Sequence, residues 1–262
     1  MRVLFYICSL TLLLSCSGYQ KVLKSNDVEL KYEMAKKYYD DTEYFKALPL
    51  LDELHLLYKG TNRAEEVDYL LAYTHYGLGA NMLASYYFKI FTLTYPNSKH
   101  VEELSFMSAY CYYLESPSST LDKTNTLKAI SELQSFIDRY PESKRVSECN
   151  ELIDNLTVKV HVKAFKIAKL YHDIEDYKAA ITALNNLIID YPTIENQQEI
   201  LYLILQSNYQ LAINSIQSKK EERFNNTIAA FNYFKNNNTN EKLLNDAQNI
   251  YDKTLKQLQK FQ

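Results

Sequence analysis

The side chains that could perform acid–base or metal chemistry in this 262-residue chain are scattered and match no catalytic pattern. A metal-binding pair on a helix needs histidines spaced i, i+4, whereas His161 and His172 are 11 residues apart. The chain has 4 glycines, too few for a phosphate-binding loop, and no Gly-x-Ser-x-Gly motif. Adjacent acid pairs, such as Glu65-Glu66 and Glu102-Glu103, point in different directions on a helix, and we interpret them as solvated or helix-dipole charges. The sequence therefore predicts no catalytic residue, no metal site and no cofactor, and we do not expect an enzyme.

Cys16 is the one cysteine that stands in a processing pattern. Residues 1–15 carry a single charge and an uncharged, mostly apolar stretch, Val3 to Leu14, which is too short to span a bilayer as a helix. The stretch ends in Leu13-Leu14-Ser15-Cys16 and resembles a bacterial lipoprotein signal, in which the cysteine takes diacylglycerol and becomes the mature N-terminus. An ordinary secretory signal with an incidental cysteine is the alternative. We expect a signal peptide at 1–15, lipid attachment at Cys16 and a lipidated tether over 16–27.

Cys111 and Cys149 remain when Cys8 leaves with the signal and Cys16 is acylated. An exported pair can be oxidised to a disulfide. However, both cysteines lie in predicted helices of different repeats, and neither has the spacing of a metal or redox site. We favour two free thiols over a bridge.

Apolar runs of common spacing indicate the second helix of a repeated helix pair. Each run starts at an alanine and has large apolar residues four and seven positions later, and three of the four runs end in Tyr-Pro 12 residues after the alanine. The small residue lets two helices approach closely, the apolar residues form one stripe, and proline ends the helix. The alanines are Ala47, Ala84, Ala129 and Ala180, and the prolines are Pro96, Pro141 and Pro192.

The first helices of the repeats align in the same register. We number each repeat from its expected first helical residue, which is position 1: Val28, Glu65, Glu102 and His161. Position 8 is then always alanine and position 11 is a large planar residue: Ala35, Ala72, Ala109 and Ala168, followed by Tyr38, His75, Tyr112 and Tyr171. This pattern is typical of tetratricopeptide (TPR) repeats. We therefore predict an all-α, TPR-like helix-turn-helix solenoid of about five repeats, in which His75 is a packing residue.

Two departures from the register show where the repeats are interrupted. The third repeat carries eight extra residues between its helices, near Ser116–Asp122, which we expect to form a surface loop. The fourth repeat starts 14 residues late, which is close to four helical turns, so one elongated middle helix is predicted over about residues 142–172.

The C-terminal part forms a degraded fifth repeat. Gln197–Ile216 is amphipathic, its partner helix opens at Phe224, and Glu241–Phe261 is expected to cap the exposed end. The predicted domains are 28–141, with TPR repeats 1–3, and 142–262, with repeats 4–5 and the capping helix.

First-helix positions 2, 5, 9, 12 and 13 line the concave surface in TPR arrays, and here they are rich in rings. Of the fifteen such positions in the first three repeats, seven are Tyr and one is Phe, against 13% aromatic residues in the chain. A groove of this kind suits an extended peptide that carries aromatic side chains. Packing of the rings against the next repeat is the alternative. The predicted peptide-binding residues are Tyr32, Tyr39, Tyr69, Tyr73, Tyr76, Phe106, Tyr110 and Tyr113.

The charge of the chain is nearly balanced. The net charge is -3, and no basic block or basic helix face is present. Nucleic acid is therefore not an expected partner, and the membrane is expected to be contacted through the lipid anchor only.

The chain resembles the BamD family, the TPR-repeat outer-membrane lipoproteins of the β-barrel assembly machinery. The resemblance covers nearly the whole chain, including the third-repeat insertion. It is carried by Cys16 with the short tether Ser17–Lys24, by the first-repeat stretch Lys31–Tyr39, and by the Tyr-Pro-x-Ser closures at Tyr95–Ser98 and Tyr140–Ser143. The Asn-rich C-terminal repeat, with Asn225-Asn226 and Asn236-Asn237-Asn238, departs from the family, so we transfer no contact residue to it.

The resemblance implies a non-catalytic adaptor, lipid-anchored at the periplasmic face of the bacterial outer membrane. Members of the family recognise unfolded barrel precursors, which often end in an aromatic residue, with their N-terminal repeats. Their C-terminal repeats dock a BamA-like barrel insertase, alongside other subunits of the assembly complex. The alternative function is a lipid-anchored TPR scaffold for cell-envelope or wall-remodelling proteins. A glycan-uptake lipoprotein is disfavoured, because such proteins use Trp platforms and this chain has no Trp.

Overall fold

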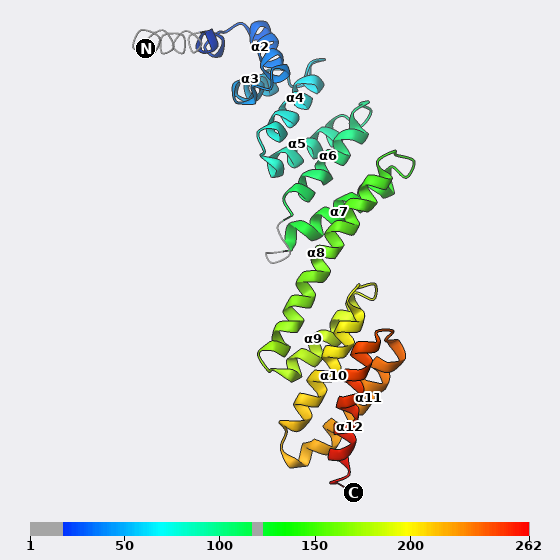
Figure 1. The fold of residues 1–262 in the computed structure, drawn as a ribbon. Coiled ribbons are helices and arrows are strands. Elements are labelled where there is room, and N and C mark those ends of the chain that lie inside the picture. The colour runs from blue at the N-terminus through cyan, green and yellow to red at the C-terminus, as the bar shows by residue number, and fades with distance from the viewer. Residues whose placement is uncertain (1–17, 117–122, 262) are drawn as a thin grey trace, which may run out of the picture. The chain divides into compact units, whose positions relative to one another are not determined.

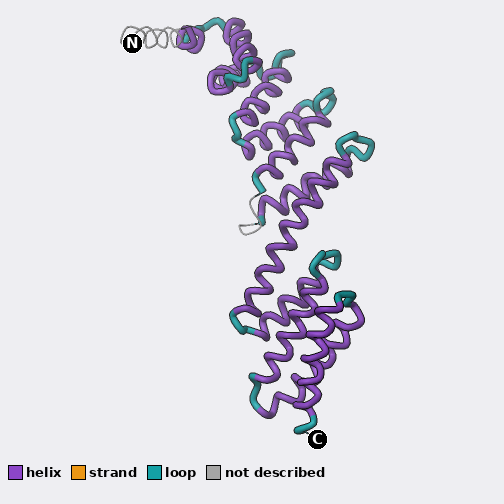
Figure 2. The backbone as a smooth tube through the Cα atoms, viewed as in Figure 1, coloured by secondary structure: helices purple, strands orange, loops and turns teal. Residues whose placement is uncertain are grey.

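The computed structural model describes residues 18–116 and 123–261, and within these ranges every regular element is a helix (Figure 1). The expected signal peptide, the expected lipidation site Cys16 and most of the third-repeat insertion lie outside the described residues. The helices are α2 (Val28–Asp40), α3 (Tyr44–Leu57), α4 (Ala64–Gly77), α5 (Asn81–Thr94), α6 (Val101–Leu114), α7 (Thr124–Arg139), α8 (Val146–Asp173), α9 (Tyr177–Asp190), α10 (Gln197–Ile213), α11 (Gln217–Asn237) and α12 (Glu241–Leu258). Figure 2 shows consecutive helices joined by short loops. The all-α, TPR-like class is confirmed: α2/α3 to α10/α11 form helix-turn-helix pairs, and α12 follows them.

Contacts divide the chain into two compact units, Met1–Thr157 and Val158–Gln262. The division falls within α8, which has 28 residues and is therefore about 42 Å long at 1.5 Å per residue. The elongated middle helix is confirmed, with bounds of 146–173 in place of 142–172.

Alanine allows close approach at the predicted positions. All eight repeat alanines are at most 2% exposed: Ala35, Ala72, Ala109 and Ala168 in the first helices, and Ala47, Ala84, Ala129 and Ala180 in the second. A larger side chain at any of these positions would force two packed backbones apart.

In repeats 1, 2 and 4, the residue at position 15, in the turn between the two helices, has a left-handed backbone conformation. The residues are Thr42 (φ 59°), Gly79 (φ 74°) and Glu175 (φ 64°). Only glycine adopts this region without a steric cost, so Gly79 is the favourable residue for the turn and the other two are held there by the packed helices.

The second helices end where the prolines require. Tyr95, Tyr140 and Tyr191 follow the last residues of α5, α7 and α9, and their ψ angles of 63°, 63° and 71° have left the helical region. A residue before proline is driven out of the helical conformation, so the Tyr-Pro pairs fix these ends.

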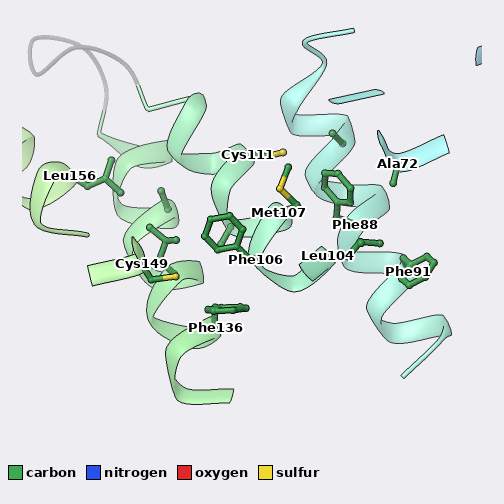
Figure 3. Packing of buried hydrophobic residues seen from close by; sticks show 14 residues of the cluster. Ala72, Phe88, Phe91, Leu104, Phe106, Met107, Cys111, Phe136, Cys149 and Leu156 are labelled. Carbon is green, nitrogen blue, oxygen red and sulfur yellow. The ribbon is translucent and has the colours of Figure 1, made fainter. Parts of the chain in front are cut away.

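The core of the first unit contains both remaining cysteines as free, buried thiols. Figure 3 shows Cys149 near Phe136 and Cys111 near Met107, with the two sulfur atoms apart. Burial raises the pKa of Cys111 to about 12 and that of Cys149 to about 11, so both are protonated at neutral pH.

The structure differs from the predicted boundaries mainly at the two ends. Residues 18–23, expected to belong to the tether, are helical, and Val22 is buried against the first repeat. α10 ends at Ile213, α11 begins at Gln217 rather than near Phe224, and α12 ends at Leu258. The first turns of α11 are polar, so the apolar periodicity starts later than the helix itself.

Candidate peptide-binding surface

Each of the two Tyr-Pro-x-Ser loops forms a hydrogen bond with the first helix of its own repeat. Ser98 donates to Glu65 at 2.6 Å, and Ser143 donates to Glu102 at 2.6 Å. Each serine also accepts a backbone N–H two residues ahead, at 3.1 and 3.2 Å. Glu65 and Glu102 lie in the first turns of α4 and α6, as expected for helix-dipole charges, and in addition each accepts a loop hydroxyl at position 1 of its repeat, which the sequence did not predict.

The tyrosine of the same loop reaches position 4. Tyr95 donates to Asp68 at 2.7 Å, and the Tyr140 hydroxyl lies 3.4 Å from the Ser105 hydroxyl. Asp68 also holds His55, with Nδ1 at 2.5 Å from Oδ1. Burial and then the bond to Asp68 raise the pKa of Tyr95, so the hydroxyl stays protonated as a donor.

The glutamate at position 2 accepts a hydrogen bond from a tyrosine of the preceding first helix, which joins consecutive first helices. Tyr32 of α2 donates to Glu66 of α4 at 2.5 Å, and Tyr73 of α4 donates to Glu103 of α6 at 2.7 Å. Lys36 also bonds Glu66 at 2.8 Å. The bonds from Lys36 and Tyr32 hold the pKa of Glu66 below its usual range. Tyr32 at position 5 and Tyr73 at position 9 thus serve the repeat junctions, and the recurrence of Glu at position 2 is the sequence signal that could have found them.

In the first three repeats, the residue just before α4, α6 or α8 lies against the ring at position 5. The Arg63 guanidinium lies 4.4 Å from the Tyr32 ring centre, the His100 ring 4.6 Å from that of Tyr69, and the Arg145 guanidinium 4.2 Å from that of Phe106. Tyr32 and Phe106 are 6% and 2% exposed. These two predicted groove residues are therefore floor residues, and sequence reasoning missed the cations that cover them.

The remaining predicted rings form the surface that we call the open rings: Tyr39, Tyr69, Tyr73, Tyr76, Tyr110 and Tyr113, all of them partly exposed. Along α4, ring centres lie 4.7 Å apart between Tyr69 and Tyr73 and 6.5 Å apart between Tyr73 and Tyr76. Along α6, Tyr110 stacks on Tyr113 at 5.7 Å.

Electrostatic contacts connect the open rings across helices. Burial and then the neighbouring Tyr69 hydroxyl raise the pKa of Tyr39, and burial and then the Tyr110 hydroxyl raise that of Tyr76. The structure therefore brings open rings of α2, α4 and α6 near one another.

Gly77 leaves room for the Tyr44 ring, which lies beside the open ring Tyr39. A Cβ at residue 77 would lie 2.3 Å from the Tyr44 ring, which in turn lies 5.8 Å from the Tyr39 ring. Any side chain at position 13 of this repeat would displace Tyr44.

The fourth repeat has different side chains at the same positions. There, Lys169 pairs with Asp173 at 2.7 Å, His172 bonds Ser207 at 2.8 Å, and Phe165 packs against the core. The open rings are thus confined to the first unit.

The arrangement is suited to holding a ligand. Within 18–116 and 123–261, no group of three or more His, Cys, Asp or Glu could hold a metal ion. Over the same ranges, no helix has the length and apolarity to cross a membrane. The open rings offer large apolar faces and hydroxyl donors, which is what recognition of an extended peptide with aromatic side chains requires.

Comparison with known proteins identifies the chain's relatives. Residues 24–224 match the family model YfiO, described as an outer membrane lipoprotein. The outer membrane protein assembly factor BamD of Caulobacter vibrioides is 20% identical over 222 residues, which cover 83% of this chain and 71% of that protein. The resemblance to the BamD family is thereby confirmed, and this chain belongs to the YfiO family of outer membrane lipoproteins.

Proposed function

We propose that this protein is a non-catalytic adaptor of outer-membrane β-barrel assembly, anchored through a lipid on Cys16 at the periplasmic face of the outer membrane. Family membership and a relative named as an assembly factor support the role. The open rings bind unfolded barrel precursors, and the C-terminal repeats bind a BamA-like insertase. Acyl chains on Cys16 confine the adaptor to the surface where the insertase works, which raises their effective concentration.

The open rings carry this proposal. Tyrosine supplies a large amphipathic contact area at low entropic cost, and six partly exposed rings on three packed helices form a preorganised surface. Hydrogen bonds and the guanidinium groups of Arg63 and Arg145 fix the floor residues Tyr32 and Phe106 beside them, so peptide binding requires little further loss of conformational entropy.

The test replaces three of the open rings. In the triple variant Tyr76→Ala, Tyr110→Ala and Tyr113→Ala, we expect affinity for a synthetic last-strand peptide of a barrel precursor, ending in Phe, to fall at least about tenfold. The matched control is Tyr86→Ala, because Tyr86 is 58% exposed on α5 and lies outside the open rings. Fluorescence anisotropy measures binding, and circular dichroism checks helicity.

Equal affinity of the triple variant and the wild type would remove the peptide-binding assignment. The scaffold for cell-envelope or wall-remodelling proteins would then be the better reading. The two functions separate by crosslinking in membranes, since a scaffold would hold a wall enzyme and an assembly adaptor would hold the insertase.

A further inference from the structure

The first helices of repeats 1, 2, 3 and 5 carry a glutamate at position 2 and an aromatic ring at position 5, close to one helical turn apart. In α10 the register places position 1 at Gln198, one residue inside the helix, as in α4 and α6. Burial supports this register, because positions 3, 7 and 10 of α10 are buried, as they are in repeats 2 and 3. The four pairs are Glu29 and Tyr32, Glu66 and Tyr69, Glu103 and Phe106, and Glu199 and Tyr202.

The first repeat shows what such a pair holds. Arg63, the residue before α4, places its guanidinium 4.4 Å from the Tyr32 ring centre, and its Nη1 donates to Glu29 at 2.5 Å. The glutamate and the ring thus hold one arginine: the carboxylate accepts the hydrogen bond, and the ring face attracts the positive charge. In the next two repeats, an imidazole and a guanidinium lie against the position-5 ring from the same place in the chain.

The fifth repeat has the glutamate and the ring but no such cation. The residue before α12 is Asn240, which caps that helix by accepting from the backbone N–H groups of Lys242 and Leu243 at 3.1 and 3.3 Å. Within the part of the chain that the structure describes, Glu199 forms no hydrogen bond or ion pair, and no cation lies over the Tyr202 ring. A cleft of about 830 Å³ is present instead, lined by Glu199, Tyr202 and Asn240 among others.

The walls of this cleft complement a positively charged peptide. Among the described residues that line it, the charged ones are the exposed Glu195 and Glu199 and one cation, Lys242. Burial and then the Asp246 carboxylate raise the pKa of Tyr202, so the hydroxyl stays neutral and a further negative charge lies near the ring. The other polar lining groups are Asn and Gln amides, each of which offers a donor and an acceptor to a peptide backbone.

The fourth repeat shows that an asparagine before the next helix does not by itself make such a site. Asn196 precedes α10, but position 2 of this repeat is Val162. The position-5 ring, Phe165, lines a space of only about 40 Å³. This junction therefore has neither a carboxylate to fix a cation nor the volume to admit one.

We propose that the cleft of Glu199 and Tyr202 binds an arginine side chain presented by an extended segment of a partner polypeptide. The guanidinium lies on the Tyr202 ring and donates to Glu199, as Arg63 does in the first repeat, and the amide side chains bond the backbone on either side. Arginine is preferred to lysine, because a planar guanidinium can stack on a ring while it donates to a carboxylate. The inference depends on this cleft alone, so its failure would leave the proposed function of the open rings in place.

A fluorine label on the ring reports occupation of the cleft directly. The full lipid-anchored protein, in detergent micelles, carries Tyr202→3-fluorotyrosine. The probe is the acetylated and amidated peptide of residues 60–64, Gly-Thr-Asn-Arg-Ala, in which the arginine is the only charge. We expect a saturable change of the fluorine-19 chemical shift. Citrulline in place of the arginine, which keeps the shape without the charge, should weaken binding at least about fivefold, and lysine should also weaken it.

Variants of the protein test the second partner of the arginine. Glu199→Gln should weaken binding at least about fivefold. The matched control is Glu221→Gln on α11, because Glu221 is an exposed carboxylate of the same unit outside the cleft, and it should bind as the wild type does. Asn240→Arg supplies an arginine from the chain itself and should block the probe, whereas Asn240→Ala, which loses the cap alone, should still bind it.

Four outcomes would overturn the proposal. They are an unchanged fluorine-19 shift, equal affinity of the arginine probe and either substituted probe, a Glu199→Gln variant that binds as tightly as the wild type, and an Asn240→Arg variant that binds the probe as Asn240→Ala does.

Discussion

Equivalent junctions of the two units differ in chemistry. In the first unit, the Ser98 and Tyr95 hydroxyls donate to Glu65 and Asp68. In the second unit, the serine position is Ile194, which is buried, and Tyr191 packs on the His161 ring at 4.8 Å. Of the 24 tyrosines, 17 lie before residue 158. In a hydroxyl–carboxylate junction, the hydrogen bond fixes the tyrosine ring while part of the ring stays exposed. In an apolar junction, the contact itself buries the side chains that form it.

Core truncations give the largest expected effect and test whether the two units are energetically separate. Phe88→Ala removes a fully buried ring from the first unit, and Leu184→Ala empties the same kind of site in the second. Losses of about 3–5 and 2–5 kcal/mol are expected. By hydrogen exchange, Phe88→Ala should reduce protection mainly before residue 158, and Leu184→Ala mainly after it. Equal loss in both units for either variant would show that the division at Thr157 is not an energetic boundary.

Converting one junction type into the other gives a smaller effect. Ile194→Ser alone should lower the free energy of unfolding by about 1–3 kcal/mol, because it removes buried apolar surface and adds a hydroxyl without an acceptor. Adding His161→Glu supplies the acceptor that Glu65 provides for Ser98 and should recover about 0.5–1.5 kcal/mol. A double-mutant cycle from urea unfolding measures the coupling. Strictly additive losses would mean that the hydrogen bond of the first unit does not explain its junction.

The smallest expected effect is a pH dependence. Burial lowers the pKa of His161 and of His172, so each takes up its proton at a lower pH in the folded second unit than in the unfolded chain. Stability from this source is therefore present above the unfolded pKa of about 6.5 and falls as the pH drops below it. Between pH 7 and pH 5, protection of residues after 158 should decrease, and the decrease should shrink in the His161→Gln, His172→Gln variant. An unchanged pH profile in that variant would contradict the assignment.

A carboxylate in the first unit titrates in a lower range. Glu66 has a lowered pKa, so its contribution is complete above the unfolded value of about 4.5 and is lost only as the pH falls through the folded one. Glu66→Gln should therefore lower the free energy of unfolding at neutral pH, and in urea unfolding its difference from wild type should shrink as the pH falls below about 4.5, while the pH 5–7 response of the second unit stays in place.

Much of the fold followed from periodicity. The repeat alanines, the Tyr-Pro helix ends and the elongated α8 were predictable because each depends on local spacing along one helix. His75 is buried and stacks on Tyr87 at 4.8 Å, as a packing residue should. The start of α11 was not predictable from apolar periodicity, since its first two turns carry polar residues.

The candidate site was less predictable, because its details depend on which repeat faces which. Residue types placed the rings at groove positions, but the covering of Tyr32 by Arg63 and of Phe106 by Arg145 depends on packing between helices far apart in sequence. Lys31 is similar: a lysine on a helix reads as exposed, yet it is buried and bonds Glu53 at 2.6 Å. Such pairings join residues that are far apart in the sequence, so they produce no periodic pattern that a single sequence could reveal.

The close contact between Tyr44 and Gly77 limits how this chain can vary. Even one methyl group at residue 77 would occupy the space of an aromatic ring. Because the Tyr44 ring neighbours Tyr39, a substitution at residue 77 would also alter the open rings, although residue 77 is not one of them. Sequence variation at this helix end is therefore constrained from a neighbouring repeat, because any larger residue at 77 requires the Tyr44 ring to move.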